Sequence, residues 1–154
     1  MSKDPNSVPA SQTIRVASSI DGKLQPCRVW PAKASGPRPL LISLHTWGGT
    51  FEQNSYGYVI EGVSRDWHSI MPDFRGPNIQ PEACGSPLAR QDILDAIEWA
   101  KANLNVDTDR IYIAGGSGGG HMTLRMVAHA PHIFAAASAW CPISDLAAWY
   151  REHV

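Results

Sequence analysis

The stretch Ile111-Tyr-Ile-Ala-Gly-Gly-Ser-Gly-Gly-Gly-His-Met122 places a serine between a β-branched, aromatic run and a segment with helical spacing. Strand, glycine-rich turn and helix around a G-x-S-x-G pattern form the context of a serine nucleophile elbow. Glycines beside the serine remove Cβ atoms that would collide in so sharp a turn. Backbone N–H groups at the start of the helix can stabilise a developing oxyanion. The stretch therefore predicts an α/β architecture in which Ser117 is a nucleophile.

A glycine-rich turn between a strand and a helix can also bind phosphate, so that alternative needs a test. A Walker A loop continues from its last glycine into lysine, whereas His121 follows Gly120 here. The dinucleotide-binding register G-x-G-x-x-G does not fit residues 114–122 either. The pattern favours the nucleophile elbow.

Length and charge exclude several classes of protein. A chain of 154 residues predicts one domain. Thirteen basic and fourteen acidic residues give a net charge of −1, which indicates neither nucleic-acid nor anionic-membrane binding. No apolar run resembles a signal peptide or a transmembrane helix. We expect a soluble protein, with the cytoplasm as its default location.

The cysteines give no sign of a metal site. Cys27, Cys84 and Cys141 are widely spaced, and no C-x-x-C pair or Cys/His cluster occurs. We therefore expect free thiols, no metal and no cofactor, although a bridge between Cys84 and Cys141 stays open.

Extended and helical patterns alternate along the chain. We expect residues 1–12 to form a flexible leader and residues 13–154 to form one core. The expected strands are Thr13–Ser19, Lys23–Trp30, Leu40–His45, Ser69–Phe74, Arg110–Ala114 and Phe134–Trp140. The expected helices are Ser55–Asp66, Leu88–Leu104, Gly118–His129 and Leu146–Tyr150. This alternation predicts an α/β fold with a mainly parallel sheet and helices on both faces.

Further segments occur in a characteristic order around the serine turn. They are Leu44-His-Thr-Trp-Gly-Gly49, Pro72-Asp-Phe-Arg-Gly-Pro-Asn78, Asp92-Ile-Leu-Asp-Ala-Ile-Glu-Trp99, and Phe134–Trp140 with Pro142-Ile-Ser-Asp145. With them, nearly all of residues 13–150 resembles the α/β-hydrolase fold, and specifically the catalytic domain of the prolyl oligopeptidase family.

The resemblance implies a role for several residues. Ser117 matches the nucleophile, and the backbone N–H of Gly118 matches one oxyanion donor. Trp47 stands in the loop that supplies the second donor, through its indole N–H or its backbone N–H, unless it is only a hydrophobic wall. The resemblance gives Asp73 and Arg75 a mostly structural role beneath the site.

The family's acid and base follow the serine on later strands, and the chain ends soon after Trp140. The resemblance therefore implies a truncated α/β-hydrolase fold that lacks the last two strands, with their Asp and His. A serine hydroxyl needs a general base. Asp145 with His153 is the best local substitute, although Asp145 is also placed to cap the helix that follows it. We expect His45 and His121 to pack in the interior.

These inferences predict a serine hydrolase that cleaves small carboxylic esters through an acyl-enzyme on Ser117. A prolyl oligopeptidase-like peptidase, or a non-catalytic folded fragment or binding module, remains an alternative. We also expect a homo-oligomer, assembled through the strand Phe134–Trp140 and the C-terminal segment, because an unpaired strand edge readily pairs with another chain.

Overall fold

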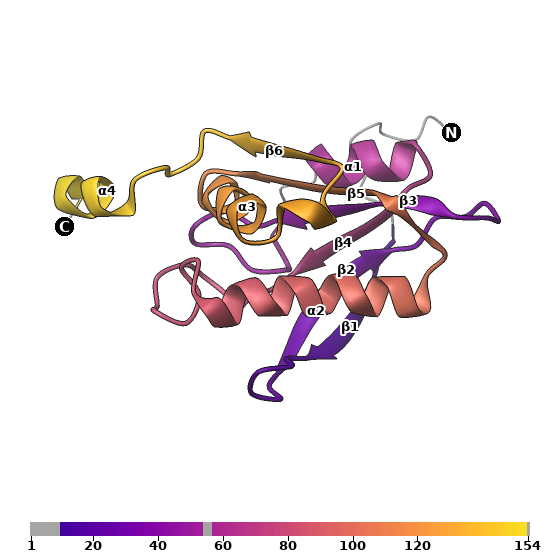
Figure 1. The fold of residues 1–154 in the computed structure, drawn as a ribbon, viewed down its shortest axis with the longest axis horizontal. Helices are drawn as coiled ribbons and strands as arrows, with labels where there is room; N and C mark the ends of the chain where they lie inside the picture. Colours follow the sequence, from indigo (N-terminus) through magenta and orange to yellow (C-terminus); the bar gives the residue numbers. More distant parts are fainter. Residues whose placement is uncertain (1–9, 54–56, 154) are drawn as a thin grey trace.

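The computed structural model describes residues 10–53 and 57–153, and in these ranges the chain forms a twisted sheet with helices on both faces (Figure 1). The sheet has six strands in the order β1-β2-β4-β3-β5-β6. The strands are β1 (Gln12–Ala17), β2 (Leu24–Trp30), β3 (Arg38–Leu44), β4 (His68–Pro72), β5 (Val106–Gly116) and β6 (Ala136–Trp140). Most of the expected leader lies outside the described residues, and Gln12 already belongs to β1.

The sheet is mainly parallel, as the sequence predicts. β4, β3, β5 and β6 run parallel to one another, whereas β1 pairs antiparallel with β2 and β2 pairs antiparallel with β4. Parallel strands end at the same edge of a sheet, so the segments that follow β3, β4 and β5 meet there. This edge holds the serine turn.

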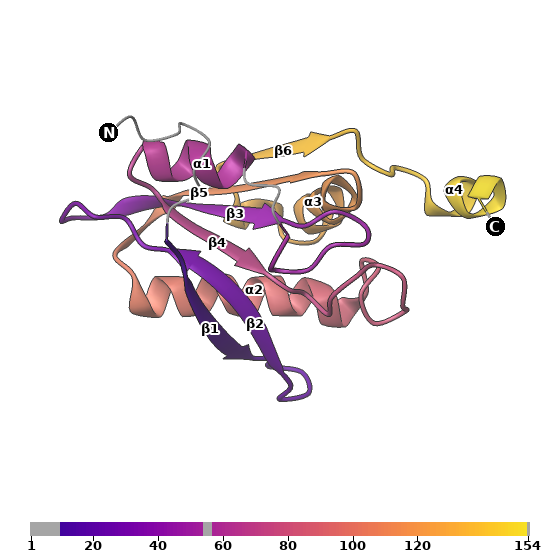
Figure 2. The same cartoon turned by 180° about the vertical axis from the view of Figure 1, so that it is seen from behind.

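The helices lie in two layers. α1 (Gly57–Ser64) covers one face of the sheet, and α2 (Pro87–Asn103) and α3 (Gly118–His129) cover the other (Figure 2). α4 (Leu146–His153) lies past the carboxyl end of β6, away from the sheet (Figures 1 and 2). A mainly parallel sheet with helices on both faces confirms the expected α/β architecture.

α2 shows why the sequence folds in this way. Ser86 caps the helix by accepting from the backbone N–H of Ala89, and Pro87 occupies the first turn, where its missing N–H costs nothing. Ile93, Ile97 and Ala100 share one face and are fully buried against the sheet. Burying one such isoleucine stabilises the fold by roughly 1.5–3 kcal/mol.

Some element boundaries differ from the expected ones. β5 begins at Val106 rather than Arg110, because the pairing with β3 shifts register between Arg38 and Leu40 and so takes in the polar residues 107–109. α1 begins at Gly57, and the preceding residues 54–56 lie outside the described ranges. No helix in the described ranges has the length and apolar character needed to cross a membrane.

Candidate active site

Ser117 occupies a sharp turn between β5 and α3, and its side chain is exposed. Its φ of 55° and ψ of −117° are rare for a residue with a Cβ and cost of the order of 1–3 kcal/mol. Two backbone bonds hold the turn: the N–H of Ser117 donates to the carbonyl of Trp140 at 2.9 Å, and the N–H of His121 donates to the carbonyl of Ser117 at 3.0 Å. The strained serine at a helix N-terminus is the geometry that the sequence predicts for an elbow.

The glycines around Ser117 are required by close backbone approaches. A Cβ on Gly115 would collide with the backbone of Gly119, and one on Gly119 would collide with the carbonyl oxygen of Leu44. A Cβ on Gly118 would lie 2.5 Å from both the backbone nitrogen and the Cα of Trp47. The start of α3 is therefore packed directly against the loop that follows β3.

That loop, residues 46–53, brings Trp47 to the elbow. The backbone nitrogen of Trp47 lies beside Gly118, the residue that follows the serine. The indole ring contacts Trp149 of α4, with ring centroids 4.7 Å apart. The carbonyl of Trp47 accepts from the backbone N–H of Asn78 at 2.7 Å. Of the expected residues, the structure thus brings Ser117, Gly118 and Trp47 together.

Sequence reasoning missed the side chains that anchor this loop. Gln53 accepts from both the backbone N–H (2.7 Å) and the hydroxyl (2.9 Å) of Thr46. The carboxylate of Asp73 accepts from the N–H of Phe51 at 3.0 Å. No periodicity reveals such contacts, because they are made by single polar residues in irregular segments.

His45 is buried directly beneath the loop, with 1% of its surface exposed. Its ring stacks on Phe74 at 3.9 Å, and its Nδ1 and Nε2 lie 2.9 and 2.8 Å from the carbonyl oxygens of Thr46 and Asp73. Burial lowers the pKa of His45, against the opposing effect of these two contacts. His45 packs in the interior, as expected, and does not contact Ser117.

The imidazoles of His121 and His68 also make hydrogen bonds to backbone groups. His121 is buried, and its Nδ1 lies 2.9 Å from the carbonyl oxygen of Ile143. His68 accepts from the N–H of Ala32 through Nδ1, at the far end of the sheet. Burial is the main cause that lowers the pKa of each. Both rings bond backbone groups rather than the serine hydroxyl.

The expected pair of Asp145 and His153 is separated by a helix. The carboxylate of Asp145 accepts from the N–H of Ala148 at 2.9 Å and so caps α4. His153 is the last residue of that helix, and its side chain lies outside the described part of the structure. A helix rises about 1.5 Å per residue, which places the two backbones about 12 Å apart along the axis. The pairing of Asp145 with His153 therefore stays a prediction.

Arg75 has the structural role that the resemblance implies. Its guanidinium is 5% exposed and bonds the carboxylates of Asp92 (2.6 and 3.1 Å) and Asp21 (2.8 and 3.0 Å), and the hydroxyl of Ser18. The bond from Arg75 is the main cause that lowers the pKa of Asp21. The cluster ties the N-terminal hairpin to α2 beneath the site.

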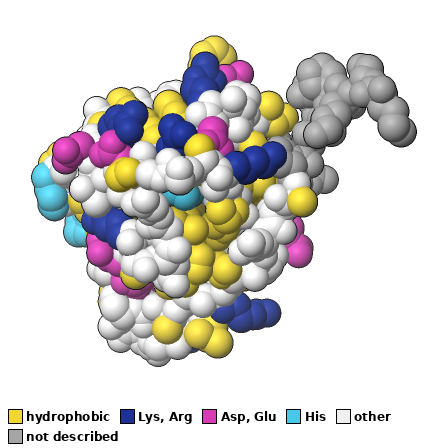
Figure 3. Space-filling model, turned by 90° about the vertical axis from the view of Figure 1, so that its right-hand side faces the viewer, with side chains coloured by type: hydrophobic (Ala, Val, Ile, Leu, Met, Phe, Trp, Pro, Cys, Tyr) yellow, Lys and Arg dark blue, Asp and Glu magenta, His cyan; other side chains and the backbone are white. Residues whose placement is uncertain are grey.

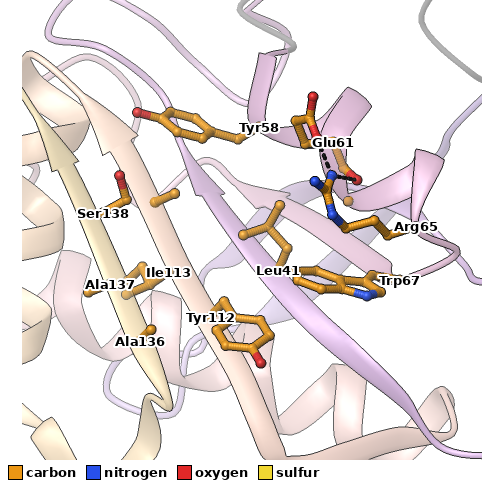
Figure 4. Close-up of a pocket in the computed structure, with 12 residues that line it drawn as sticks. Leu41, Tyr58, Glu61, Arg65, Trp67, Tyr112, Ile113, Ala136, Ala137 and Ser138 are labelled. Atoms are coloured by element: carbon orange, nitrogen blue, oxygen red, sulfur yellow. Dashed lines mark hydrogen bonds and ion pairs between the residues drawn. The ribbon is translucent and has the colours of Figure 1, made fainter.

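A cavity of about 420 Å³ lies on the α1 face of the sheet rather than at the elbow (Figure 4). Tyr58, Trp67 and Tyr112 contribute to its apolar lining, and the ion pair of Glu61 with Arg65 lies on its rim. Ser117 does not line it. The described residues that line the cavity include no histidine, and the serine among them, Ser138, stands within β6 rather than on a strained turn. The elbow therefore remains the candidate site.

Charges of both signs are interspersed on the face of the molecule shown in Figure 3, with hydrophobic side chains between them. This agrees with the nearly balanced formal charge of the chain. The three cysteines are free, with Cys27 buried, Cys84 partly buried and Cys141 exposed, so the bridge left open by the sequence is not formed.

Comparison with known proteins supports the family resemblance. Residues 89–153, from α2 to the end of α4, match the Prolyl oligopeptidase family. The dipeptidyl aminopeptidase BIII of Pseudoxanthomonas mexicana is 30% identical over 113 residues, which are 67% of this chain and 16% of that protein. The esterase LipU of Mycobacterium tuberculosis is 29% identical over 155 residues, 95% of this chain and 49% of that protein.

Solved structures show the same fold. A puromycin hydrolase superposes with a TM-score of 0.76 at 18% identity, over 97% of this chain and 24% of that one. The chain thus spans half or less of the length of each of these relatives. It has the α/β-hydrolase fold and, over residues 89–153, matches the Prolyl oligopeptidase family.

Proposed function

We propose that the chain is a carboxylesterase that cleaves small carboxylic esters through an acyl-enzyme on Ser117. One observation carries the proposal: the exposed hydroxyl of Ser117 stands on a strained turn, beside the backbone nitrogens of Gly118 and Trp47. A nucleophile next to preorganised N–H donors is the arrangement that acyl transfer needs. Gly118 and Trp47 then stabilise the oxyanion of the tetrahedral intermediate.

The reaction follows from this geometry. The Ser117 oxygen attacks the ester carbonyl, its proton passes to a base, and the carbonyl oxygen becomes an oxyanion held by the two N–H groups. Collapse of the intermediate expels the alcohol and leaves the acyl group on Ser117, which water then removes. Activated esters suit this site, because their leaving groups require little protonation.

A peptidase is the second candidate, favoured by the family match of residues 89–153 and by the aminopeptidase relative. Amide cleavage requires protonation of a poor leaving group. The buried imidazoles of His45, His68 and His121 bond backbone groups instead of the serine. Ester substrates are therefore the better proposal, and the esterase relative agrees with them.

The test is hydrolysis of p-nitrophenyl acetate and labelling by a fluorophosphonate, in wild type and in Ser117→Ala. We expect wild type to turn over and to be labelled, and Ser117→Ala to lose both while keeping its melting temperature. Equal turnover in the two proteins would refute the assignment of Ser117. Absence of turnover and labelling in folded wild type would support the remaining alternative, a folded module without catalysis.

A further inference from the structure

We propose that Gln53 and His45 are positioning residues that orient the peptide between Thr46 and Trp47, so that the backbone N–H of Trp47 is the second oxyanion donor. The proposal rests on the esterase function proposed above. It assigns the donor to the backbone of Trp47 and leaves the indole as part of the wall formed with Trp149.

The first step is the geometry of the peptide. In a trans peptide the C=O and N–H groups point in opposite directions. Fixing the carbonyl of Thr46 therefore also fixes the direction of the N–H of Trp47. That nitrogen lies close to the Cα of Gly118, whose own N–H is the other donor.

The second step is what holds Thr46. Its carbonyl accepts from the backbone N–H of Gly49 at 3.1 Å, and the Nδ1 of His45 lies 2.9 Å from the same oxygen. Its own N–H and hydroxyl both donate to the Oε1 of Gln53. Every polar group of Thr46 is thus held, two by one amide oxygen of Gln53.

The third step concerns the tautomer of His45. A buried neutral imidazole has one N–H, so only one of its two carbonyl neighbours receives a hydrogen bond. The Asp73 carbonyl already accepts from the N–H of Gly76 at 2.9 Å, a shorter bond than the one from Gly49 to Thr46. The Thr46 carbonyl is therefore the one that gains more from the imidazole proton, which places that proton on Nδ1.

Gln53 provides a matched test. Gln53→Met keeps the length of the side chain but removes the acceptor, whereas Gln53→Glu keeps an Oε1 for Thr46. Gln91→Met makes the same change on α2, where the amide of Gln91 donates to the carboxylate of Asp95 one helical turn away. We expect Gln53→Met to lower kcat for p-nitrophenyl acetate by about tenfold or more with little change in KM, since loss of a whole donor costs about 10²–10³. Gln53→Glu should recover most of this loss, and Gln91→Met should retain wild-type kcat.

The phosphonylation rate of Ser117 is a readout that a merely structural role would not move. We expect it to fall with kcat in Gln53→Met while the melting temperature stays within the range of Gln91→Met. Equal kcat and phosphonylation rates in wild type and Gln53→Met would overturn the positioning role. A wild type that neither turns over nor is labelled would instead refute the esterase function itself.

His45 gives an independent second test. The amide nitrogen of Asn can replace Nδ1, and that of Gln reaches the place of Nε2, while both variants lose the stacking on Phe74. We expect His45→Asn to retain more kcat than His45→Gln at equal folded fraction. The reverse order would overturn the role of Nδ1.

Trp47→Phe tests the donor itself. A loss of about 10²–10³ in kcat in this variant would assign the donor to the indole and overturn the proposal.

Discussion

At the scale of one residue, the backbone conformation that exposes the hydroxyl of Ser117 lowers the stability of the fold. Its φ of 55° and ψ of −117° strain the backbone of a residue that carries a Cβ. The fold tolerates this strain because the N–H of Ser117 is bonded to the carbonyl of Trp140 and its carbonyl to the N–H of His121. A residue without a Cβ would relieve that strain. The hydroxyl is therefore kept in a position where glycine would be the more stable choice.

We predict that Ser117→Gly is more stable than Ser117→Ala by about 1 kcal/mol, because alanine keeps the strained Cβ and glycine does not. Both variants lack the hydroxyl, so neither should be labelled by a fluorophosphonate. Urea unfolding of the two variants side by side measures the difference. A less stable glycine variant would mean that the turn stores no strain.

At the scale of elements, the junction of β5 and α3 depends on backbone contacts that only glycine permits. A Cβ on Gly119 would collide with the carbonyl oxygen of Leu44 at the end of β3, whereas Gly57 at the start of α1 has open space. The close approach of Gly119 to Leu44 joins α3 to β3, and the segments at this junction form the site.

We predict that Gly119→Ala lowers the free energy of unfolding by about 1–3 kcal/mol, as overpacking of a close contact does. Gly57→Ala is the matched control and should stay within about 0.5 kcal/mol of wild type, since it meets no neighbour. Thermal and urea unfolding measure both. A Gly119→Ala protein as stable as the control would contradict the observed packing of α3 on β3.

The elements themselves were largely predictable, and the reason is their periodicity. The mostly apolar run 40–44 is buried on both faces in β3, and the helical spacing of Ile93, Ile97 and Ala100 marks the inner face of α2. Glycines around Ser117 signalled the elbow because sterics leave few alternatives there. The anchors of the loop of residues 46–53 were not predictable, because Gln53 holds Thr46 through two local hydrogen bonds in an irregular segment. The boundary of β5 was missed because residues 107–109 are polar and joined the sheet through a register shift.

At the scale of the whole molecule, buried histidines couple stability to pH. Burial lowers the pKa of His45, His68 and His121 below the ordinary value of 6.5. The unfolded chain binds these protons at a higher pH than the folded chain, so the stability they contribute is lost as pH falls below about 6.5. The lowered pKa of Asp21 acts with the same sign near pH 4 and below.

We predict that the urea midpoint falls between pH 7.5 and pH 5.5, before the carboxylates titrate. His68→Gln should reduce this dependence, because it removes one of the three histidines whose pKa is lowered by burial. His132→Gln, at an exposed position of the short 3-10 helix η1 (Pro131–Ile133), is the control and should leave the slope of the midpoint against pH unchanged. A midpoint independent of pH over this range would contradict the prediction.

The outer edge of the sheet also belongs to this scale. Within the described residues β6 pairs only with β5, and Trp140 at its end is 69% exposed. Residues 133–144 contain no charged side chain. Natural edge strands are usually guarded by charges, by proline or by a covering element. We propose that a second copy of this chain pairs with β6, which would also extend the C-terminal segment toward a neighbouring elbow.

We predict that light scattering at micromolar concentration returns an oligomer. Ser138→Lys, at the centre of β6, should shift the protein to monomer, because burying a charge at a paired strand edge is costly. Leu124→Lys, on the exposed side of α3, is the matched control and should keep the oligomer.

If the partner's C-terminal segment supplies the base through His153, His153→Ala and Ser117→Ala should each be inactive alone. Mixing and reassociating the two would then restore part of the activity, since one interface joins an intact serine to an intact histidine. A monomeric wild type contradicts the assembly, and an active His153→Ala chain excludes that histidine as the base.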